Sequence, residues 1–192
     1  MRVVAGRYRG RRLEAPQGRS LRPTSERSRE ALFSILESGR LSDGHRLPQG
    51  ARVLDAFAGT GALGIEAFSR GAASVTFLEN ATEALACLRR NLKGLEPSEA
   101  LQIKRADVLQ PPAASAPCDL LLMDPPYDRD LAAPALTALA DAGWIGPETL
   151  IVVESSNREL EHAPTGFTLL DQRRYGRARL SFLHRDRDSL TG

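Results

Sequence analysis

The sequence predicts an α/β fold with a mostly parallel, doubly wound β-sheet, and three features of the chain predict it. Strand-like apolar segments alternate with helix-like segments from residue 51 onward, which is typical of parallel strands joined by crossover helices. Glycines at positions 59, 61 and 64 form a G-x-G-x-x-G pattern between the first of these strands and the first helix. Two strand-like segments near the end have no helix between them and predict a terminal antiparallel hairpin.

A small β-hairpin and a helix are expected before this domain. Residues 3–6 and 11–14 flank a glycine-containing turn and predict the hairpin, which should end at Pro16. The helix is expected to begin at Thr24 or Ser25, which are both good N-cap residues, and to end near Gly39.

The polar stretch over residues 42–50 contains glycine and proline and predicts a linker. We therefore expect an Arg-rich N-terminal extension over residues 1–45 and a main domain over residues 46–192. At 192 residues and 42% hydrophobic content, the chain is long enough to bury a core. The expected strands of the main domain cover residues 52–57, 74–78, 101–105, 119–123, 150–153, 168–170 and 179–183, and its expected helices cover residues 63–70, 82–92 and 131–142.

Composition argues against several classes of protein. No early apolar stretch has the form of a signal peptide, and none approaches the roughly 20 residues that a membrane helix needs, so we expect a cytoplasmic protein without membrane contact. Cys87 and Cys118 lack metal-ligand spacing, which predicts buried free thiols and no metal site. No long apolar stripe is left over for a partner, so a monomer is expected.

Positive charge gathers at the start of the chain, although the formal net charge is only +2. Arginines interleaved with Gly6, Tyr8 and Gly10 could form a solvated arm or a surface that binds phosphates. We favour the second, because Arg forks match phosphate geometry while glycine and tyrosine permit close approach and stacking. The residues expected to bind nucleic acid are Arg7, Arg9, Arg11, Arg12 and Arg22.

The glycine pattern predicts that a nucleotide-containing cofactor approaches the backbone at the carboxyl edge of the sheet. Glu79, at the end of the next strand, is placed to bind ribose hydroxyls. Asp55 precedes the glycines, where it could order the loop or meet an amino group of the cofactor, and Asp107 follows the third strand beside an expected adenine pocket. Each aspartate could equally be a turn or cap residue. NAD and S-adenosylmethionine both fit this pattern.

The residues Asp124-Pro125-Pro126-Tyr127 follow an apolar strand and indicate a site that methylates an amine. Two consecutive prolines cannot continue a strand, so the chain must leave it as a stiff loop. Asp124 and nearby carbonyls supply acceptors for a planar exocyclic amine, and Tyr127 offers a flat face on which a base could stack. Taken alone, the four residues could also be a plain strand terminator.

Residues 55–61, 78–80 and 124–127 together resemble the bacterial 16S ribosomal RNA guanine-N2 methyltransferase family, of the RsmD type. The N-terminal residues Ala5-Gly6, Arg9-Gly10 and Arg22-Pro23-Thr24 resemble that family's N-terminal segment, so the resemblance covers essentially the whole chain. It implies a Rossmann-like, class I S-adenosylmethionine-dependent methyltransferase domain, with an extension that binds RNA.

The resemblance also implies the reaction, which is methyl transfer from S-adenosylmethionine to the N2 amine of guanine 966 of 16S rRNA, in the small ribosomal subunit or an assembly intermediate. The implied catalytic residues are Asp124, Pro125, Pro126 and Tyr127. The expected cofactor-binding residues are Asp55, Phe57, Gly59, Thr60, Gly61, Glu79, Asn80 and Asp107.

Three alternatives remain open. An adenine-N6 methyltransferase shares the cofactor and the Asp-Pro-Pro-Tyr chemistry, but this chain has no room for a sizeable target-recognition domain. An NAD-dependent oxidoreductase would leave residues 124–127 and the N-terminal arginines without roles. A non-catalytic RNA-binding protein would not need the acidic residues at the strand ends.

Overall fold

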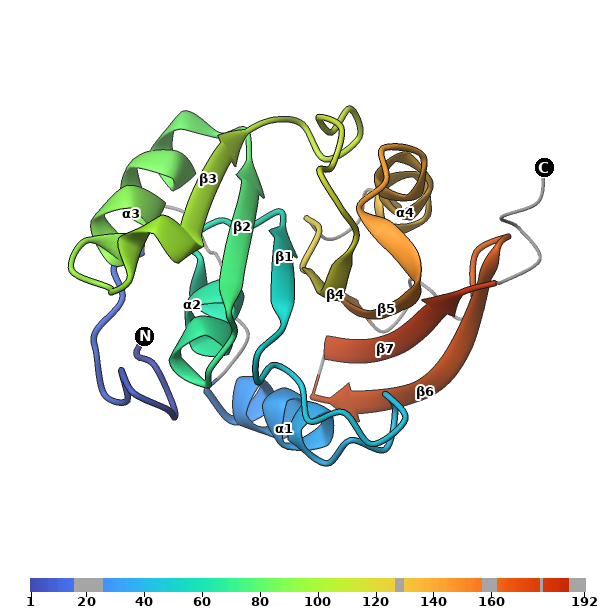
Figure 1. Ribbon diagram of the computed structural model, residues 1–192, viewed down its shortest axis with the longest axis horizontal. Coiled ribbons are helices and arrows are strands. Elements are labelled where there is room, and N and C mark those ends of the chain that lie inside the picture. The colour runs from blue at the N-terminus through green and yellow to red at the C-terminus, as the bar shows by residue number, and fades with distance from the viewer. Residues whose placement is uncertain (16–25, 127–129, 157–161, 177, 187–192) are drawn as a thin grey trace.

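One mixed β-sheet organises the molecule, of which the computed structural model describes residues 1–15, 26–126, 130–156, 162–176 and 178–186. Within these residues it has seven strands in the order β3-β2-β1-β4-β5-β7-β6 (Figure 1). The first five strands in that order are parallel, and β7 runs antiparallel to both of its neighbours. The predicted doubly wound sheet with a terminal antiparallel hairpin is therefore confirmed. The strands are β1 (Arg52–Ala56), β2 (Ser74–Glu79), β3 (Leu101–Arg105), β4 (Cys118–Met123), β5 (Ile145–Ser156), β6 (Phe167–Tyr175) and β7 (Ala178–Arg185).

Two strands are longer than their sequence predicts. β5 begins at Ile145, before the expected start at Leu150, and Ile145 pairs with Cys118 ahead of an irregularity in the register. β6 continues through polar residues as far as Tyr175. It is an edge strand that pairs only with β7 among the described strands, so its polar side chains can face water.

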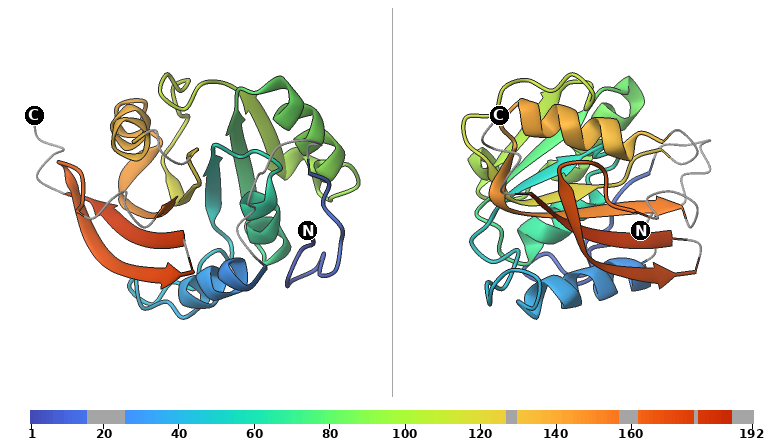
Figure 2. Two further views of the ribbon diagram at one scale, coloured as in Figure 1. Left: turned by 180° about the vertical axis from the view of Figure 1, so that it is seen from behind. Right: turned by 90° about the vertical axis from the view of Figure 1, so that its right-hand side faces the viewer.

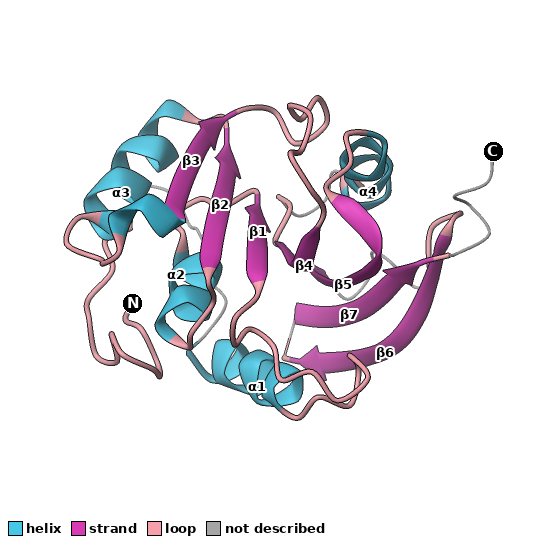
Figure 3. Cartoon of the chain, viewed as in Figure 1, coloured by secondary structure: helices cyan, strands magenta, loops and turns pink. Residues whose placement is uncertain are grey.

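Three helices follow the prediction to within one residue: α2 (Ala62–Ser69), α3 (Thr82–Leu92) and α4 (Ala132–Asp141). α1 covers Glu26–Glu37, while its expected N-cap at Thr24 or Ser25 lies outside the described residues. The connection from β3 to β4, residues 106–117, contains no helix (Figure 3). Among the described helices, none is both long and apolar enough to cross a membrane.

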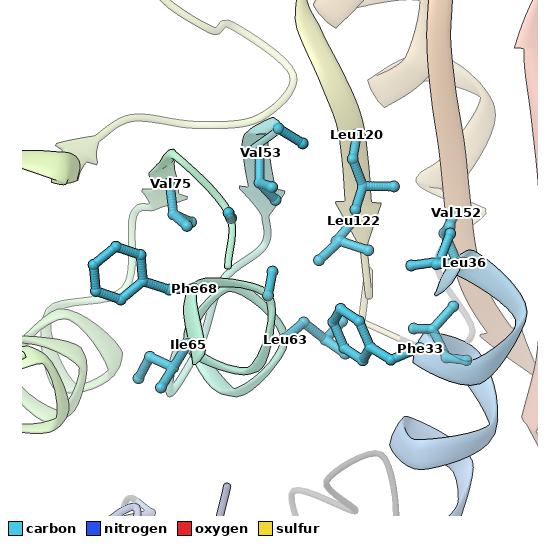
Figure 4. Close-up of a cluster of buried hydrophobic side chains, with 14 of the residues drawn as sticks. Phe33, Leu36, Val53, Leu63, Ile65, Phe68, Val75, Leu120, Leu122 and Val152 are labelled. Atoms are coloured by element: carbon cyan, nitrogen blue, oxygen red, sulfur yellow. The ribbon is translucent and has the colours of Figure 1, made fainter. Parts of the chain in front are cut away.

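Apolar side chains pack on both faces of the sheet. α1 and α4 lie on opposite sides of it, as the right-hand view of Figure 2 shows. On the side of α1 and α2, Phe33 and Phe68 belong to a cluster with the strand residues Val53, Leu120 and Val152 (Figure 4). On the other side, α4 packs on the alternate residues of the same strands. Period-two alternation along the strands thus decides which side chains face which helices.

The helix α2 is buried on every side, because residues 1–15 cover the face turned away from the sheet. Residues 63–69 are all buried. Val3 and Leu13 belong to the same apolar cluster as α2. The predicted N-terminal hairpin is present as a single bridge between Arg2 and Arg12. The division at residue 45 stays a prediction, since the extension and the sheet share one core.

One buried carboxylate attaches the N-terminal segment to α2. Glu66 accepts the backbone N–H groups of Val4 and Ala5 at 2.8 and 2.9 Å. It also accepts Nε of Arg70 at 2.8 Å and lies 3.5 Å from Nε of the buried Arg29 of α1. Arg29 in turn donates to the backbone carbonyl of Arg2. A single side chain therefore connects α1, α2 and the start of the chain.

Replacing Glu66 should destabilise the fold severely. Glu66→Ala leaves Arg29 buried without its counter-charge and two backbone N–H groups without an acceptor, which should lower the free energy of unfolding by roughly 3–5 kcal/mol. The control is Glu37→Ala, which removes only the partly exposed ion pair with Arg70 and should cost less than about 1 kcal/mol. Urea unfolding of both variants measures the difference, and equal losses would contradict this role of Glu66.

Candidate active site

Acidic side chains from several strands meet at the carboxyl edge of the sheet. Asp55 lies near the end of β1, Glu79 ends β2, and Asp124 directly follows β4. Parallel strands end at the same edge, and open α/β sheets bind their ligands there. The structure therefore brings together the acidic residues that the sequence had indicated on three separate strands.

The glycine-rich loop leaves β1 in a left-handed backbone conformation. Phe57 has φ 58°, and Gly59 and Gly61 have φ 56° and 79°. Such a value is uncommon and strained for a residue with a side chain, and strained residues of this kind gather at ligand sites. A bond from the N–H of Ala58 to the carbonyl of Leu78, 3.0 Å long, fixes the loop against β2.

The glycines of the pattern serve different purposes. A side chain on Gly61 would collide with Leu88 of α3, and one on Gly64 would collide with Phe77 of β2. Both glycines therefore allow close packing behind the loop. A Cβ on Gly59 would meet only a carbonyl oxygen at 3.8 Å, so the backbone there is open to a ligand.

The carboxylate of Glu79 holds the loop from the neighbouring strand. It accepts the N–H groups of Gly59, Asn80 and Ala81, each at 2.8 Å. A carboxylate has about four lone-pair positions, so these bonds do not exhaust its capacity as an acceptor. Its expected contact with a ribose stays a prediction, whereas its bonds to the loop are present in the structure.

Asp55 joins the end of β1 to the first turn of α2. It is 2% exposed, and its Oδ2 accepts the N–H of Gly64 at 2.8 Å. Burial raises the pKa of Asp55 to about 8, against the lowering effect of the bond from Gly64, and the charge of Glu79 raises it further. Asp55 is therefore a carboxyl group that gains a proton easily.

The remaining expected cofactor residues surround the same edge. Asn80 and Asp107 are exposed, and Thr60 is partly exposed. Asp107 accepts the N–H of Leu109 at 2.9 Å, in the turn after β3. Asp107 can act both as a turn residue and as a cofactor ligand, because only one of its two carboxylate oxygens accepts the bond from Leu109.

Asp124 is partly exposed at the end of β4, with Pro125 buried and Pro126 exposed after it. Tyr127 lies outside the described residues. Burial raises the pKa of Asp124 well above its usual range, and the charges of Glu154 and Asp55 raise it further. Glu154, on β5, did not stand out in the sequence analysis. The signal that could have found it is an acidic residue directly after an apolar run, since Glu154 follows residues 150–153 as Glu79 follows Phe77 and Leu78.

The N-terminal arginines differ in their surroundings. Arg9 and Arg12 are exposed. The guanidinium of Arg7 lies 4.1 Å from the ring centre of Phe68. Arg11 donates to the backbone carbonyls of residues 91, 93 and 94 at the end of α3, where a positive charge is favoured by the helix dipole. Arg22 lies outside the described residues.

Asn91 of α3 is a further residue that the sequence did not indicate. Its Nδ2 donates to the carbonyls of Thr60 and Glu14 at 2.9 and 3.1 Å, and its Oδ1 accepts the N–H of Glu14 at 2.8 Å. The buried amide thus connects the glycine-rich loop to the N-terminal segment. An asparagine late in a helix carries no recognisable signal of such a role.

Cys87 and Cys118 are free and buried, as predicted. No cluster of three or more metal-ligating side chains occurs in the described part of the chain.

The sheet order, the antiparallel β7 and the glycine-rich loop after β1 define a class I S-adenosylmethionine-dependent methyltransferase fold. Residues 1–184 match the family model described as "Conserved hypothetical protein 95", and the chain belongs to this family, the RsmD family.

Named relatives and solved structures agree with this assignment. "Ribosomal RNA small subunit methyltransferase D" of Haemophilus influenzae is 35% identical over 92% of this chain and 89% of its own. The protein of the same name from Escherichia coli is 36% identical over 81% of this chain and 74% of its own. A solved structure, "Putative methyltransferase yhhF from Escherichia coli", has a TM-score of 0.79 at 32% identity and covers 97% of this chain and 98% of its own.

The raised pKa of Asp55 predicts how stability depends on pH. The folded state holds this proton more tightly than the unfolded state, so the free energy of unfolding should fall as pH rises from about 4 towards about 8, by at most about 1.4 kcal/mol per pH unit for one proton. Asp55→Asn keeps an acceptor for Gly64 but cannot ionise. The free energy of unfolding of this variant should therefore depend less on pH over this interval.

Urea unfolding between about pH 4 and about pH 8 measures this effect. Asp119→Asn is the matched control, because Asp119 also accepts a backbone N–H, from Arg52, but is exposed to water. If the curves for wild type and Asp55→Asn ran parallel over this range, the burial of an ionisable Asp55 would not explain the pH dependence.

Proposed function

We propose that this protein transfers the methyl group of S-adenosylmethionine to the N2 amine of a guanine in 16S rRNA, at the position numbered 966. The observation that carries the proposal is the place of Asp124, which directly follows a buried strand beside the glycine-rich loop, in a chain of the RsmD family. The proposed substrate is the small ribosomal subunit or an assembly intermediate, and it implies a cytoplasmic enzyme. We expect the enzyme to act as a monomer.

The glycine-rich loop and the strand ends suit the cofactor. Gly59 offers a backbone without a side chain in the way, and the acceptor capacity left on Glu79 suits ribose hydroxyls. Bound S-adenosylmethionine would supply an electrophilic methyl group. The residues proposed to hold it are Asp55, Phe57, Gly59, Thr60, Gly61, Glu79, Asn80 and Asp107.

Asp124 is proposed to orient the amine and accept its protons. The lone pair of an exocyclic amine is delocalised into the ring, so the nitrogen is a poor nucleophile until positive charge on it is stabilised and a proton is removed. A carboxylate with a raised pKa is the better proton acceptor for this step. Pro125 and Pro126 stiffen the loop that carries it. Tyr127 would stack on the base, with a contribution of roughly 1–3 kcal/mol.

The N-terminal extension, residues 1–45, is proposed to bind the rRNA backbone, and residues 46–192 to carry out the methyl transfer. Arg9 and Arg12 are exposed and are available to phosphates. Arg7 and Arg22 are proposed to join them. Arg11 already donates to three carbonyls at and just beyond the end of α3, so its contribution to the extension is partly structural.

The product distinguishes this proposal from its rivals. Purified protein and labelled S-adenosylmethionine are incubated with unmodified small subunits, naked 16S rRNA and DNA, and the nucleosides are analysed by mass spectrometry. Labelled N2-methylguanosine from the ribosomal substrates is expected. Labelled methyladenine would instead support an adenine-N6 methyltransferase, and competition by NAD for the cofactor site would support an oxidoreductase.

Substitutions of Asp124 test its role in the same assay. Asp124→Ala should lower kcat by at least about 100-fold, because an acceptor and general base is lost. Asp124→Asn should retain more activity, since an amide carbonyl still accepts a hydrogen bond from the amine. Asp141→Asn, at the exposed end of α4, controls for the change of charge. Equal losses in the two Asp124 variants would mean that the negative charge itself is required.

Removing exposed arginines should weaken the salt dependence of RNA binding. Arg9→Ala and Arg12→Ala should each reduce the slope of log affinity against log salt by about 0.7 to 0.9 for every phosphate that the arginine neutralises. Arg174→Ala is the control, because Arg174 is exposed but lies on β6, outside the extension of residues 1–45. RNA affinity measured at several salt concentrations gives the slopes. An unaltered slope would mean that these arginines are solvated surface residues that do not neutralise phosphates.

A further inference from the structure

The N-terminal segment lies along the second half of α3. The hydroxyl of Tyr8 donates to the carbonyl of Glu96 at 2.9 Å and accepts the N–H of the same residue at 2.7 Å. Arg11 donates to the carbonyls of residues 91, 93 and 94. Glu14 pairs with Arg90, with 2.6 Å between Oε2 and Nε. These partners stand 76 to 88 positions apart in the chain, so residues 8–14 and 87–96 form one surface only in the folded protein.

This surface carries more positive charge than the chain as a whole. The two stretches contain six basic and two acidic residues, a formal charge of +4, whereas the whole chain carries +2. Both acidic side chains are already engaged, since Glu14 pairs with Arg90 and Glu96 accepts the N–H of Ser98 at 3.1 Å. The exposed cations with no such engagement are Arg9, Arg12, Arg89 and Lys93, which we call the α3 basic surface.

Arg89 and Lys93 have no structural task among the described residues. Neither side chain makes a hydrogen bond or an ion pair with that part of the chain, and both are exposed. They stand four positions apart at the end of α3, so their charges lie on the same side of the helix and repel each other. An anion bound between them would remove this repulsion.

The dipole of α3 does not account for the pair. Cations are favoured near the carboxyl end of a helix because its last carbonyls lack partners. Arg11 already bonds to the carbonyls of residues 91, 93 and 94. Further cations on the solvent side of the same turn therefore gain little from those carbonyls.

The α3 basic surface is connected to the edge of the sheet where methyl transfer is proposed. Asn91 donates to the carbonyl of Thr60 in the glycine-rich loop at 2.9 Å. α3 itself begins at Thr82, three residues after Glu79 at the carboxyl end of β2. A chain of phosphates that follows α3 would therefore lead towards the carboxyl edge.

We propose that the α3 basic surface binds the phosphate backbone of the rRNA, so that Arg89 and Lys93 extend the RNA-binding site from the N-terminal extension onto the methyltransferase domain. This inference rests on the proposed function. Arginine forks and the lysine ammonium both bind phosphate oxygens. Such contacts read no base, and they fix the position and orientation of the RNA.

The surface suits RNA better than a protein partner. Protein interfaces are anchored by large apolar or aromatic side chains that become buried on binding. Among the described residues the exposed large apolar side chain is Leu170, which lies on β6 and not near α3. Uncompensated cations without an apolar anchor are typical of a surface that binds a polyanion.

The test measures the affinity of the full-length protein for naked 16S rRNA at several salt concentrations. Arg89→Ala and Lys93→Ala should each reduce the slope of log affinity against log salt by about 0.7 to 0.9 for every phosphate that the side chain neutralises. Lys93→Arg keeps the charge and should keep the slope. Both positions are exposed, so the variants are expected to fold, and thermal unfolding checks this.

Arg174→Ala is the matched control. Arg174 is also exposed, but it lies on β6, at the opposite edge of the sheet from β3. Its removal changes the net charge by the same amount and should leave the slope as it is in wild type. A slope that falls equally in all three alanine variants would reflect net charge alone and would overturn the proposal.

Unaltered slopes in Arg89→Ala and Lys93→Ala, or no measurable binding of naked rRNA by wild type, would also overturn it. A loss of affinity for assembled small subunits but not for naked rRNA would mean that the surface contacts a protein, which contradicts the proposal as well. Product formation is measured separately on the same preparations. Reduced slopes without any N2-methylguanosine would contradict the proposed function and not the RNA contact, so the two failures are distinguishable.

Discussion

The burial of Glu66 is the interaction on which the arrangement of the molecule depends. Its side chain is 0% exposed, yet it carries a charge that must be matched inside the protein. Two backbone N–H groups, Arg29 and Arg70 match it, and they come from the N-terminal segment, α1 and the end of α2. Separating any of these elements would leave a buried charge or donor without a partner, at a cost of several kcal/mol. The N-terminal extension is therefore part of the core, and the bonds and ion pairs of Glu66 fix where α2 lies.

The same kind of contact then builds the edge of the sheet. Asp55 and Glu79 each accept backbone N–H groups of the loop that opens α2 or of its first turn. Asn91 extends the connection, because its amide bonds both to Thr60 in that loop and to Glu14 in the N-terminal segment. The segment that carries the arginines and the loop proposed to hold the cofactor are thus positioned by one continuous set of hydrogen bonds.

Periodicity in the sequence was enough to predict most of the sheet, three helices and the acidic residues at or next to the ends of β1, β2 and β4. Those predictions succeed because strand alternation and the glycine pattern are local signals. The sequence did not indicate Glu66, Asn91 or the structural bonds of Arg11, because many of their partners lie 61 to 83 residues away along the chain. Arg29 is charged but fully buried, and no pattern in the sequence indicates this, because its partner Glu66 is supplied by another helix.

The distribution of charge explains how a polyanionic substrate could use an acidic site. Asp55 and Glu154 are almost fully buried, whereas Arg9 and Arg12 face water. An approaching phosphate backbone would therefore meet arginines, and only an uncharged base would reach the carboxylates. At the edge of the sheet, burial and the neighbouring carboxylates raise the pKa of Asp55 and Asp124, so a negative charge on either group is costly there. Hydrogen-bond donors on a base would supply the missing compensation, and acceptors already fixed in place stabilise the positive charge that develops on an amine during methylation.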